Sequence, residues 1–500
     1  MNEVVRSAAL FTPEIALTVG LVLVVLVDAS GASWRKAVGR FLTVATLALA
    51  LVLALRLLPA GSRGASIFSG MVVVDPLGLF FKAILLAASL LTVLLFTFRN
   101  SRELFGLGHG EFYALLLAVT LSNLLMAASN DIVMLYLSLE MVSITSYVMV
   151  AYMKGDRMSN EASLKYLLFG AVSTGAMLYG LSLLYGMTGT TSLPQIQEFL
   201  AGDLSTPSRK AVYLTTFLIT AGFGFKVAAV PFHFWCPDVY QGAPTPVTAF
   251  LSVAPKAAGF AIMLRFFFGS LAQAGTGPWD LAGTIDWPQL LMVVSVLTMT
   301  VGNVAALTQT NMKRLLAYSS IAHAGYIMMG VVALSENGAR GMMIYLAAYL
   351  FMNLGAFLVV TLVHLQDGTF DLRDYAGLYR RAPLLTVAMG IFLLSLVGIP
   401  PFVGFMGKLY VFAAIVERGP EYWWYAVAAA VNAAIAAFYY FRIMKTMVID
   451  AGNENKPAFP LALADGAAVF LLAAANFLPI FFWSGIEGWA RQSLTLYAGR

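Results

Sequence analysis

Six basic residues lie within apolar stretches long enough to cross a lipid bilayer, and these residues could carry chemistry. They are Lys82, Lys165, Lys226, Lys256, Arg265 and Lys408. An ionised side chain at the bilayer centre costs about 2.5–3.5 kcal/mol on insertion scales. Arginine keeps its charge, whereas a desolvated lysine can release its proton. Several buried lysines in one chain therefore indicate a protein that moves protons or other ions across a membrane.

Glu140 and His323 are two further titratable residues inside apolar stretches. Glu140 could form an ion pair with a buried lysine, or neighbouring hydroxyls such as that of Ser143 could satisfy it. His323 could relay protons, because imidazole titrates near neutral pH, or it could be a packing residue. No spacing of His, Cys and carboxylates is typical of a metal site, so we expect no metal.

The depth of each basic residue bears on its role. Lys256 and Lys408 lie too deep in their apolar stretches to reach the surface easily. Lys226 lies near mid-membrane if its helix continues past Pro231, and near the membrane edge if the helix ends there. The length of the apolar stretch favours the first alternative.

The remaining basic residues carry weaker signals. Lys165 is spaced i,i+4 from Glu161 near the end of a span. The two residues could form an ion pair that reaches the membrane surface, or Lys165 could take part in ion transport. Lys82 and Arg265 lie toward the outer ends of their spans, and Arg265 could serve structure alone.

The composition is that of a membrane protein. Of 500 residues, 60% are hydrophobic and 11% are charged, with a mean hydropathy of +0.82. A soluble domain could not solvate such a surface, so we predict an all-α polytopic membrane protein in contact with the lipid bilayer. The net charge of +5 comes without a basic tract interleaved with aromatic residues, so we expect no nucleic-acid partner. No glycine-rich phosphate loop follows a strand, so we expect no nucleotide or flavin site.

Apolar stretches between charged residues and Gly/Pro breaks predict about fourteen transmembrane helices. The spans cover residues 9–28, 36–58, 72–98, 112–128, 131–153, 161–187, 211–241, 246–271, 289–308, 314–334, 341–365, 383–417, 423–448 and 461–484. Spans seven and twelve would reach roughly 45–50 Å as straight helices, against a hydrocarbon core of about 30 Å. Pro231 and Pro237 interrupt the first and Pro400 and Pro401 the second, so helices 7 and 12 are predicted to be broken.

The distribution of basic residues predicts the orientation. Fifteen Lys and Arg lie in odd-numbered loops and six in even-numbered loops. The positive-inside rule therefore places the odd loops in the cytoplasm and both termini on the opposite side. No signal peptide is evident at the N-terminus. We expect a multi-pass protein of the bacterial inner membrane with periplasmic termini.

A weak internal repeat relates the two halves of the chain. SITSYVMVAY, from Ser143 to Tyr152, resembles IAHAGYIMMG, from Ile321 to Gly330, at an offset of 179 residues. The copies lie on spans five and ten, so the second runs through the membrane in the opposite direction. This predicts two inverted five-helix repeats, spans 4–8 and 9–13. The expected segments are 1–110 with three helices, 111–272 and 288–448 with one repeat each, and 461–500 with the last helix.

One long motif resembles a known family. PFHFWCPDVYQGAPTPVTAFLSVAPKAAGF, from Pro231 to Phe260, is similar to the signature of the antiporter-like subunits of respiratory complex I, NADH:quinone oxidoreductase. Leu139-Glu140-Met141, Gly398-Ile399-Pro400-Pro401 and Gly407-Lys408-Leu409 also match the family pattern. The resemblance extends from span four to span thirteen, and the lysine in APKAAG points to the subunit N type, called subunit 2 in mitochondria.

The resemblance implies a fold and a set of roles. The fold would have fourteen helices with two inverted five-helix bundles. Glu140 and Lys226 would form the ion pair of the first half-channel, with Lys165 modulating Lys226. Lys256 would be the central relay and Lys408 the terminal proton site, with His323 as a bridge between them. The resemblance assigns no role to Lys82.

The implied function is outward proton translocation driven by quinone reduction in other subunits, with no redox chemistry in this chain. NADH, FMN, iron–sulfur clusters and quinone are expected in partner subunits, which include a neighbouring antiporter-like subunit. A subunit of a multisubunit Na⁺/H⁺ antiporter is one alternative, although the APKAAG lysine argues against it. A non-pumping structural membrane subunit is another, and a stand-alone solute carrier is a third.

Overall fold

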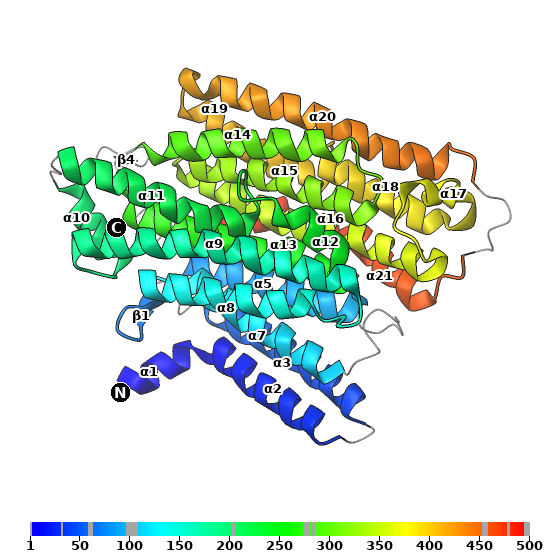
Figure 1. Ribbon diagram of the computed structural model, residues 1–500, viewed down its shortest axis with the longest axis horizontal. Coiled ribbons are helices and arrows are strands. Elements are labelled where there is room, and N and C mark those ends of the chain that lie inside the picture. The colour runs from blue at the N-terminus through cyan, green and yellow to red at the C-terminus, as the bar shows by residue number, and fades with distance from the viewer. Residues whose placement is uncertain are drawn as a thin grey trace.

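The chain folds as a bundle of long apolar helices. The computed structural model describes residues 3–31, 34–58, 64–96, 109–202, 206–273, 280–281, 286–452, 459–477 and 481–494. Eleven of the described helices are long and apolar enough to cross a membrane. Figure 1 shows the helices lying side by side along the longest axis of the molecule. The prediction of an all-α polytopic membrane protein is confirmed.

The N-terminal elements lie along one side of the bundle. They are α1 (Glu3–Leu10), α2 (Thr12–Ala29), α3 (Arg35–Arg56), a hairpin of β1 (Ala65–Ile67) and β2 (Val72–Val74), and α5 (Pro76–Phe96). Ala65 pairs with Val74 in the antiparallel register of the hairpin. In Figure 1, α2 and α3 form the lower edge, whereas α5 lies against the centre.

Two longer groups of elements build the rest of the bundle. The first comprises α7 (His109–Ala128), α8 (Ile132–Val150), α9 (Arg157–Thr188), α10 (Leu193–Ala201), α11 (Thr206–Val227), α12 (Trp235–Gly242) and α13 (Thr245–Ser270). The second comprises β3 (Ala272–Gln273), β4 (Asp280–Leu281), α14 (Trp287–Ala306), α15 (Met312–Val332), α16 (Glu336–Asp367), η1 (Leu372–Tyr375), α17 (Leu378–Arg381), α18 (Pro383–Val397), α19 (Val403–Arg418), η2 (Pro420–Tyr422) and α20 (Trp423–Val448). α21 (Leu463–Ala475) and α23 (Trp483–Gln492) follow.

The two groups repeat the same local structure. α9 and α16 each contain 32 residues. Asp156 and Ser335 cap their N-termini by accepting hydrogen bonds from backbone N–H groups two or three residues further on. Each helix ends at a glycine in the left-handed conformation, Gly189 with φ 68° and Gly368 with φ 71°. Both helices exceed the predicted spans 161–187 and 341–365, because the caps extend them into polar sequence.

Matching bridges support the predicted repeat of spans 4–8 and 9–13. Asp131 caps α8 and Asn311 caps α15. Each also forms an isolated β-bridge to the segment after the next helix, Asp131 with Ser192 and Asn311 with Asp371. The same sequence of a capped helix, a 32-residue helix and a broken helix therefore occurs twice. The division into segments 1–110, 111–272, 288–448 and 461–500 stays a prediction.

Helix 7 is broken, as predicted. α11 ends at Val227, Ala228 has a φ of 60°, and α12 begins only at Trp235. A neighbouring helix supports the unwound segment, because the Val230 N–H donates a hydrogen bond to Thr298 Oγ1 on α14 at 2.9 Å. Unpaired backbone groups are costly in an apolar medium, so such a break requires protein partners of this kind.

Helix 12 is broken in a corresponding place. α18 ends at Val397, Gly398 has a φ of 86°, and α19 begins at Val403. The Val403 N–H donates to the Asn476 carbonyl, which follows α21, at 3.0 Å. The two broken helices and α21 account for the three predicted spans beyond the eleven long helices.

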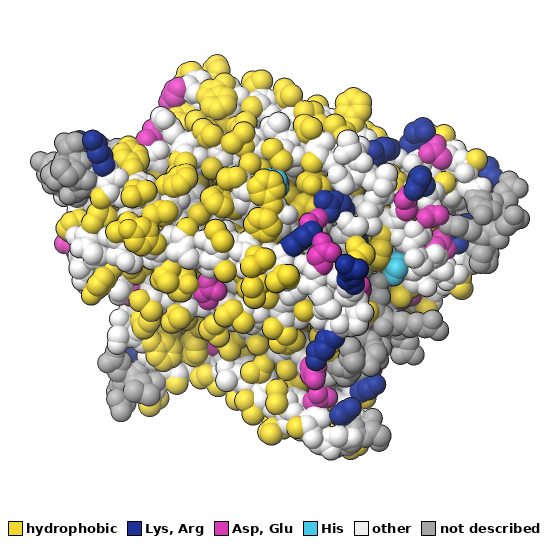
Figure 2. Space-filling model, in the orientation of Figure 1, with side chains coloured by type: hydrophobic (Ala, Val, Ile, Leu, Met, Phe, Trp, Pro, Cys, Tyr) yellow, Lys and Arg dark blue, Asp and Glu magenta, His cyan; other side chains and the backbone are white. Residues whose placement is uncertain are grey.

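The surface separates into an apolar belt and a charged end. Figure 2 shows hydrophobic side chains across most of one face and Lys and Arg gathered toward the end where α17 lies. Large apolar side chains such as Val172 and Phe438 are about three-quarters exposed, at 76% and 74%. Lipid or a partner subunit would cover such a face. Of the loop residues counted for the orientation, Arg63, Arg99, Arg102 and Lys456 lie outside the described residues.

We predict that Gly302→Val separates α14 from α15. A Cβ atom at Gly302 would lie 2.6 Å from the backbone nitrogen of Ala322, which cannot move without shifting the helix. We expect a loss of about 1–3 kcal/mol in stability, measured by thermal unfolding in detergent. Gly186→Val is the matched control, because nothing lies within 4 Å of that position. Equal effects of the two variants would contradict this account of the packing.

Candidate functional site

Lys226 is buried at the end of α11, next to the break. Its Nζ donates to Ser143 Oγ on α8 at 3.4 Å. The stem of the side chain packs against α13, because a Cβ atom at Gly259 would lie 3.2 Å from Lys226 Cγ. Gly259 is one turn beyond Lys256, so Lys226 lies beside the helix that carries the next lysine. Lys226 is 2% exposed, which excludes the interpretation in which it reaches the membrane edge.

Glu140 lies on α8 but faces outward. It is half-buried and lines a hollow of about 490 Å³ with Tyr136, Tyr147 and Thr174. No ion pair within 4.0 Å joins it to Lys226 among the described residues. Its carboxylate still exerts a Coulombic pull on Lys226. Ser143, which the sequence suggested as a partner of Glu140, is instead the acceptor for Lys226.

Lys256 is buried in α13 and held by one residue of α15. Its Nζ donates to Ser320 Oγ at 2.6 Å and to the Ser320 carbonyl at 3.1 Å. The ammonium also lies 5.7 Å from the centroid of the Tyr240 ring on α12. Two oxygen acceptors and an aromatic face stabilise a charge that would otherwise be costly at this depth.

His323 lies one turn beyond Ser320 on α15 and has a partner at each ring nitrogen. Nδ1 is 2.8 Å from Tyr345 Oη on α16, and Nε2 is 3.1 Å from Tyr440 Oη on α20. Tyr440 Oη also lies 2.5 Å from Ser319 Oγ. Hydroxyls can donate or accept, so either tautomer of the imidazole is satisfied. The geometry suits a group that exchanges protons, although such bonds also occur in packing.

Lys408, on α19, binds the end of α18 across the break between these two helices. Its Nζ donates to the Leu396 carbonyl at 3.0 Å and to the Val397 carbonyl at 2.7 Å. These carbonyls end α18 and have no partner within that helix, so the ammonium satisfies them and lies at the negative end of the helix dipole. A Cβ atom at Gly398 would lie 2.7 Å from Lys408 Cδ, so glycine leaves room for this lysine.

One face of α15 connects Lys256 to Lys408. Ser320, His323 and Tyr326 are spaced three residues apart, so their side chains lie on the same face of the helix. Ser320 binds Lys256, and the Tyr326 ring centroid lies 4.8 Å from Lys408 Nζ. His323 lies between the two, with its ring centroid 6.0 Å from that of Tyr326. The structure therefore brings Lys256, His323 and Lys408 together.

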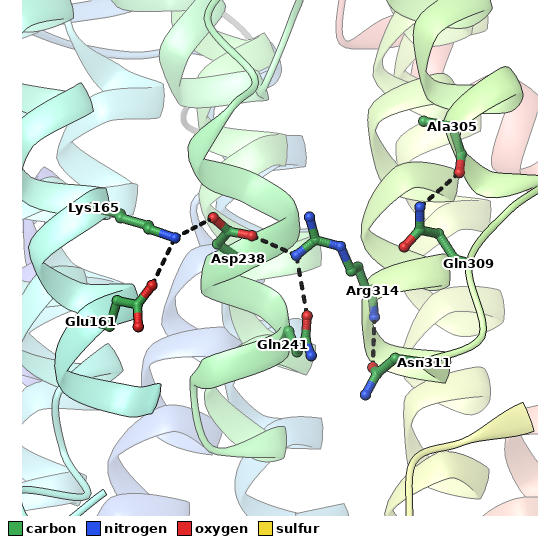
Figure 3. A network of polar contacts seen from close by, with 8 residues as sticks. All are labelled: Glu161, Lys165, Asp238, Gln241, Ala305, Gln309, Asn311 and Arg314. Atoms are coloured by element: carbon green, nitrogen blue, oxygen red, sulfur yellow. Dashed lines mark hydrogen bonds and ion pairs between the residues drawn. The ribbon is translucent and has the colours of Figure 1, made fainter. Parts of the chain in front are cut away.

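Lys165 belongs to a separate ionic network that is partly exposed (Figure 3). Its Nζ lies 2.9 Å from Glu161 and 2.7 Å from Asp238 on α12. Asp238 also binds Arg314 on α15 at 2.5 Å. The predicted Glu161–Lys165 pair is therefore present, and Asp238 extends it into a link between the two repeats. Lys165 makes no contact with Lys226 among the described interactions, so it could modulate Lys226 only at a distance.

Lys82 and Arg265 lie in buried ion pairs with carboxylates from the N-terminal elements. Lys82 Nζ is 2.6 Å from Glu14, and Arg265 Nη2 is 2.6 Å from Asp75. The sequence did not single out Glu14, which lies in the first turn of α2, or Asp238 within the PDVYQ motif. Both carboxylates lie inside predicted spans, and this position could have marked them as candidate partners of buried lysines. Within the described residues, no group of three or more His, Cys, Asp or Glu could hold a metal ion.

Fold and site together define a class: membrane proteins with two structurally related helical bundles and titratable side chains buried between broken helices. The family model described as NADH:quinone oxidoreductase/Mrp antiporter, TM matches residues 129–436. The chain belongs to this family.

Relatives and solved structures agree with this assignment. The chain is 45% identical to NADH-quinone oxidoreductase subunit N of Anaeromyxobacter sp. (strain Fw109-5), over 100% of this chain and 99% of that protein. It is similar to a chain of respiratory complex I from Thermus thermophilus, with 32% identity, a TM-score of 0.77, and coverage of 95% and 98%. A chain of the Mrp complex from Dietzia sp. has a TM-score of 0.82 at 20% identity, covering 99% and 98%, and this likeness concerns the fold alone.

We predict that Asp238→Asn weakens the link between the two repeats. The substitution leaves Lys165 and Arg314 with a neutral partner, so the free energy of unfolding should fall by about 1 kcal/mol, less at high salt. Thermal unfolding in detergent at two salt concentrations measures the change. Glu161→Gln is the matched control, because Glu161 is 59% exposed and, among the described ion pairs, joins only Lys165. A larger effect of the control would contradict the central place of Asp238.

Proposed function

We propose that this chain is a proton-translocating membrane subunit of a bacterial NADH:quinone oxidoreductase. The observation that carries the proposal is the placement of Ser320, His323 and Tyr326 on one face of α15, where Ser320 binds Lys256 and the Tyr326 ring lies beside Lys408. It occurs in a chain 45% identical over its full length to a protein named NADH-quinone oxidoreductase subunit N. Groups that can each accept and release a proton, aligned along one helix face within an apolar interior, provide a route for protons.

Lys226 receives the proton in the first half of the route. Its charge is stabilised by the Coulombic pull of Glu140 and by Ser143. If Glu140 moves further from Lys226, the ammonium loses this counter-charge and releases its proton more readily. Lys256, one turn from the point where Lys226 packs on α13, is the next acceptor.

The proton then passes along α15. It moves from Lys256 through the hydroxyl of Ser320 to His323, whose two nitrogens contact the hydroxyls of Tyr345 and Tyr440. Lys408 receives it last, beside the Tyr326 ring and the end of α18. The break that frees the α18 carbonyls is what allows Lys408 to remain charged at this depth.

Energy for this movement comes from quinone reduction in other subunits, which would hold NADH, FMN, iron–sulfur clusters and quinone. This chain would contribute only side chains that hold and move protons. Other membrane subunits, including a neighbouring antiporter-like subunit, would cover the apolar faces of α8, α9 and α20. Glu140, which opens on such a face, is placed to sense a neighbour's charge.

The multisubunit Na⁺/H⁺ antiporter remains the second candidate, because the Mrp chain shares the fold. Two observations favour the first. The chain is 32% identical to the complex I chain and 20% identical to the Mrp chain. The titratable groups along the buried route are lysines and a histidine, whose charged forms would repel a sodium ion.

We predict that Lys226→Ala and Lys256→Met each abolish outward proton transport when introduced into the intact complex. Alanine and methionine cannot carry a proton, so the route is interrupted. Proton release per electron transferred, measured in sealed vesicles after NADH addition, tests this. Lys445→Met is the matched control, because Lys445 is 61% exposed and lies outside the route.

Two outcomes would overturn the proposal. Normal proton-to-electron ratios in assembled Lys226→Ala and Lys256→Met complexes would favour a structural subunit. Transport that requires sodium and persists without electron transfer would favour the antiporter.

A further inference from the structure

Four charged side chains are buried among α2, α5 and α13, apart from the proposed route. Glu14 pairs with Lys82, and Asp75 pairs with Arg265. Two positive and two negative groups balance, and Lys82 also interacts electrostatically with Asp75. We call these four residues the outer ionic cluster, because the predicted orientation places this end of the helices opposite the cytoplasm. The cluster contains Lys82 and Arg265, two of the three intramembrane basic residues outside the route, and the third, Lys165, belongs to the network with Glu161 and Asp238.

The Asp75–Arg265 pair is fixed. Arg265 Nη1 and Nη2 donate to the two Asp75 oxygens at 2.8 and 2.6 Å, and Nε donates to the Ala127 carbonyl at 2.8 Å. Asp75 Oδ1 also accepts from the Gly78 N–H at 2.8 Å, which caps α5. Guanidinium groups do not release protons in proteins, so this pair holds permanent charges.

The Glu14–Lys82 pair has a different character. Lys82 Nζ lies 2.6 Å from Glu14 Oε1, and the two side chains are 1% and 0% exposed. Neither group makes a hydrogen bond to any other part of the described chain. Lys226, Lys256 and Lys408, in contrast, each have a hydroxyl or carbonyl acceptor. Among the described residues, each member of this pair therefore has the other as its single short-range polar partner.

Such a pair can exchange a proton along its single contact. The N–H bond of Lys82 breaks, an O–H bond forms on Glu14, and both groups become neutral. No oxidant, reductant or further reactant is needed. A buried ion pair without additional hydrogen bonds gains less stabilisation from its charges than one whose remaining polar atoms are satisfied.

A third polar group lies on the neighbouring helix. Asn123 on α7 is fully buried, and its side-chain amide makes no hydrogen bond to the described residues. It lies one turn before Ala127, whose carbonyl binds Arg265. A buried amide without a partner requires an explanation, and a site that takes up and passes on protons needs polar groups of this kind.

We propose that Glu14 and Lys82 form a proton-holding site in the N-terminal helices, poised by the fixed charges of Asp75 and Arg265. The direction of release, toward the outer face, rests on the proposed function. The N-terminal helices α2 and α5 would then take part in proton transport in addition to packing against the two repeats.

The experiment compares single and double substitutions in the intact complex. Glu14→Gln or Lys82→Met alone leaves one buried charge unpaired, so both should impair assembly. The double variant Glu14→Gln/Lys82→Met is neutral and similar in volume, so assembly should recover. If the pair holds protons, proton release per electron stays reduced in the assembled double variant. A double variant that assembles and pumps normally would show a structural pair and overturn the proposal.

The matched control is Asp367→Asn/Arg381→Met, which neutralises a largely buried ion pair outside the cluster and the route, with Arg381 Nη1 2.9 Å from Asp367 Oδ2. Its proton-to-electron ratio should match that of the unsubstituted complex. Lys226→Ala, measured in the same preparation, separates the two proposals. If Lys226→Ala pumps normally, the proposed function fails. If only the Glu14/Lys82 double variant pumps normally, this inference fails alone.

A conservative variant covers the case in which the double variant does not assemble. Glu14→Asp keeps the carboxylate and the charge balance. Infrared difference spectra during turnover should contain a protonated-carboxyl band that moves in Glu14→Asp. Absence of any band that responds to this substitution would overturn the proposal.

Discussion

The rest of the structure depends on one constraint: a buried ammonium group needs oxygen acceptors. The interior of the bundle is apolar, and the acceptors that these lysines contact come from neighbouring helices. Ser143 serves Lys226, Ser320 serves Lys256, and the last carbonyls of α18 serve Lys408. Removing any of these acceptors would leave a charge that the apolar interior cannot support. The positions of α8, α15 and α18 are thus tied to the lysines.

The broken helices meet this constraint in two ways. At the second break, the end of α18 exposes carbonyls that an unbroken helix would have used internally, and Lys408 binds them. At the first break, the unwound segment is bonded to α14 through Thr298, and Lys226 stands at the last turn before it. A break therefore provides free backbone carbonyls that can bind a buried cation. It also leaves an unwound segment whose backbone groups need hydrogen-bond partners. Lys226 and Lys408 lie beside these breaks, whereas Lys256 lies in the continuous helix α13 and is held by Ser320.

α15 has a special place in the bundle. It carries Ser320, His323 and Tyr326 on one face, and its first turn binds Asp238 through Arg314. The helix contacts the first repeat through α12 and α13 and the second through α16 and α19. A movement of α15 would alter the contacts of Lys256 and Lys408 together. This makes α15 the element through which the two halves of the chain can influence each other.

Much of this protein follows from its sequence alone. Hydropathy and proline positions predicted the multi-pass fold and both broken helices, because a stretch that crosses lipid as a helix must be apolar and has a limited length. The buried lysines were also evident, since charge in an apolar stretch is conspicuous. Tertiary structure decided their partners: Ser320 for Lys256, Tyr345 and Tyr440 for His323, and Glu14 for Lys82. These residues lie far apart in the chain, and hydroxyls in apolar helices are common, so no local pattern distinguishes an acceptor from its neighbours. Only the packing of helices sets which oxygen comes within reach of which nitrogen.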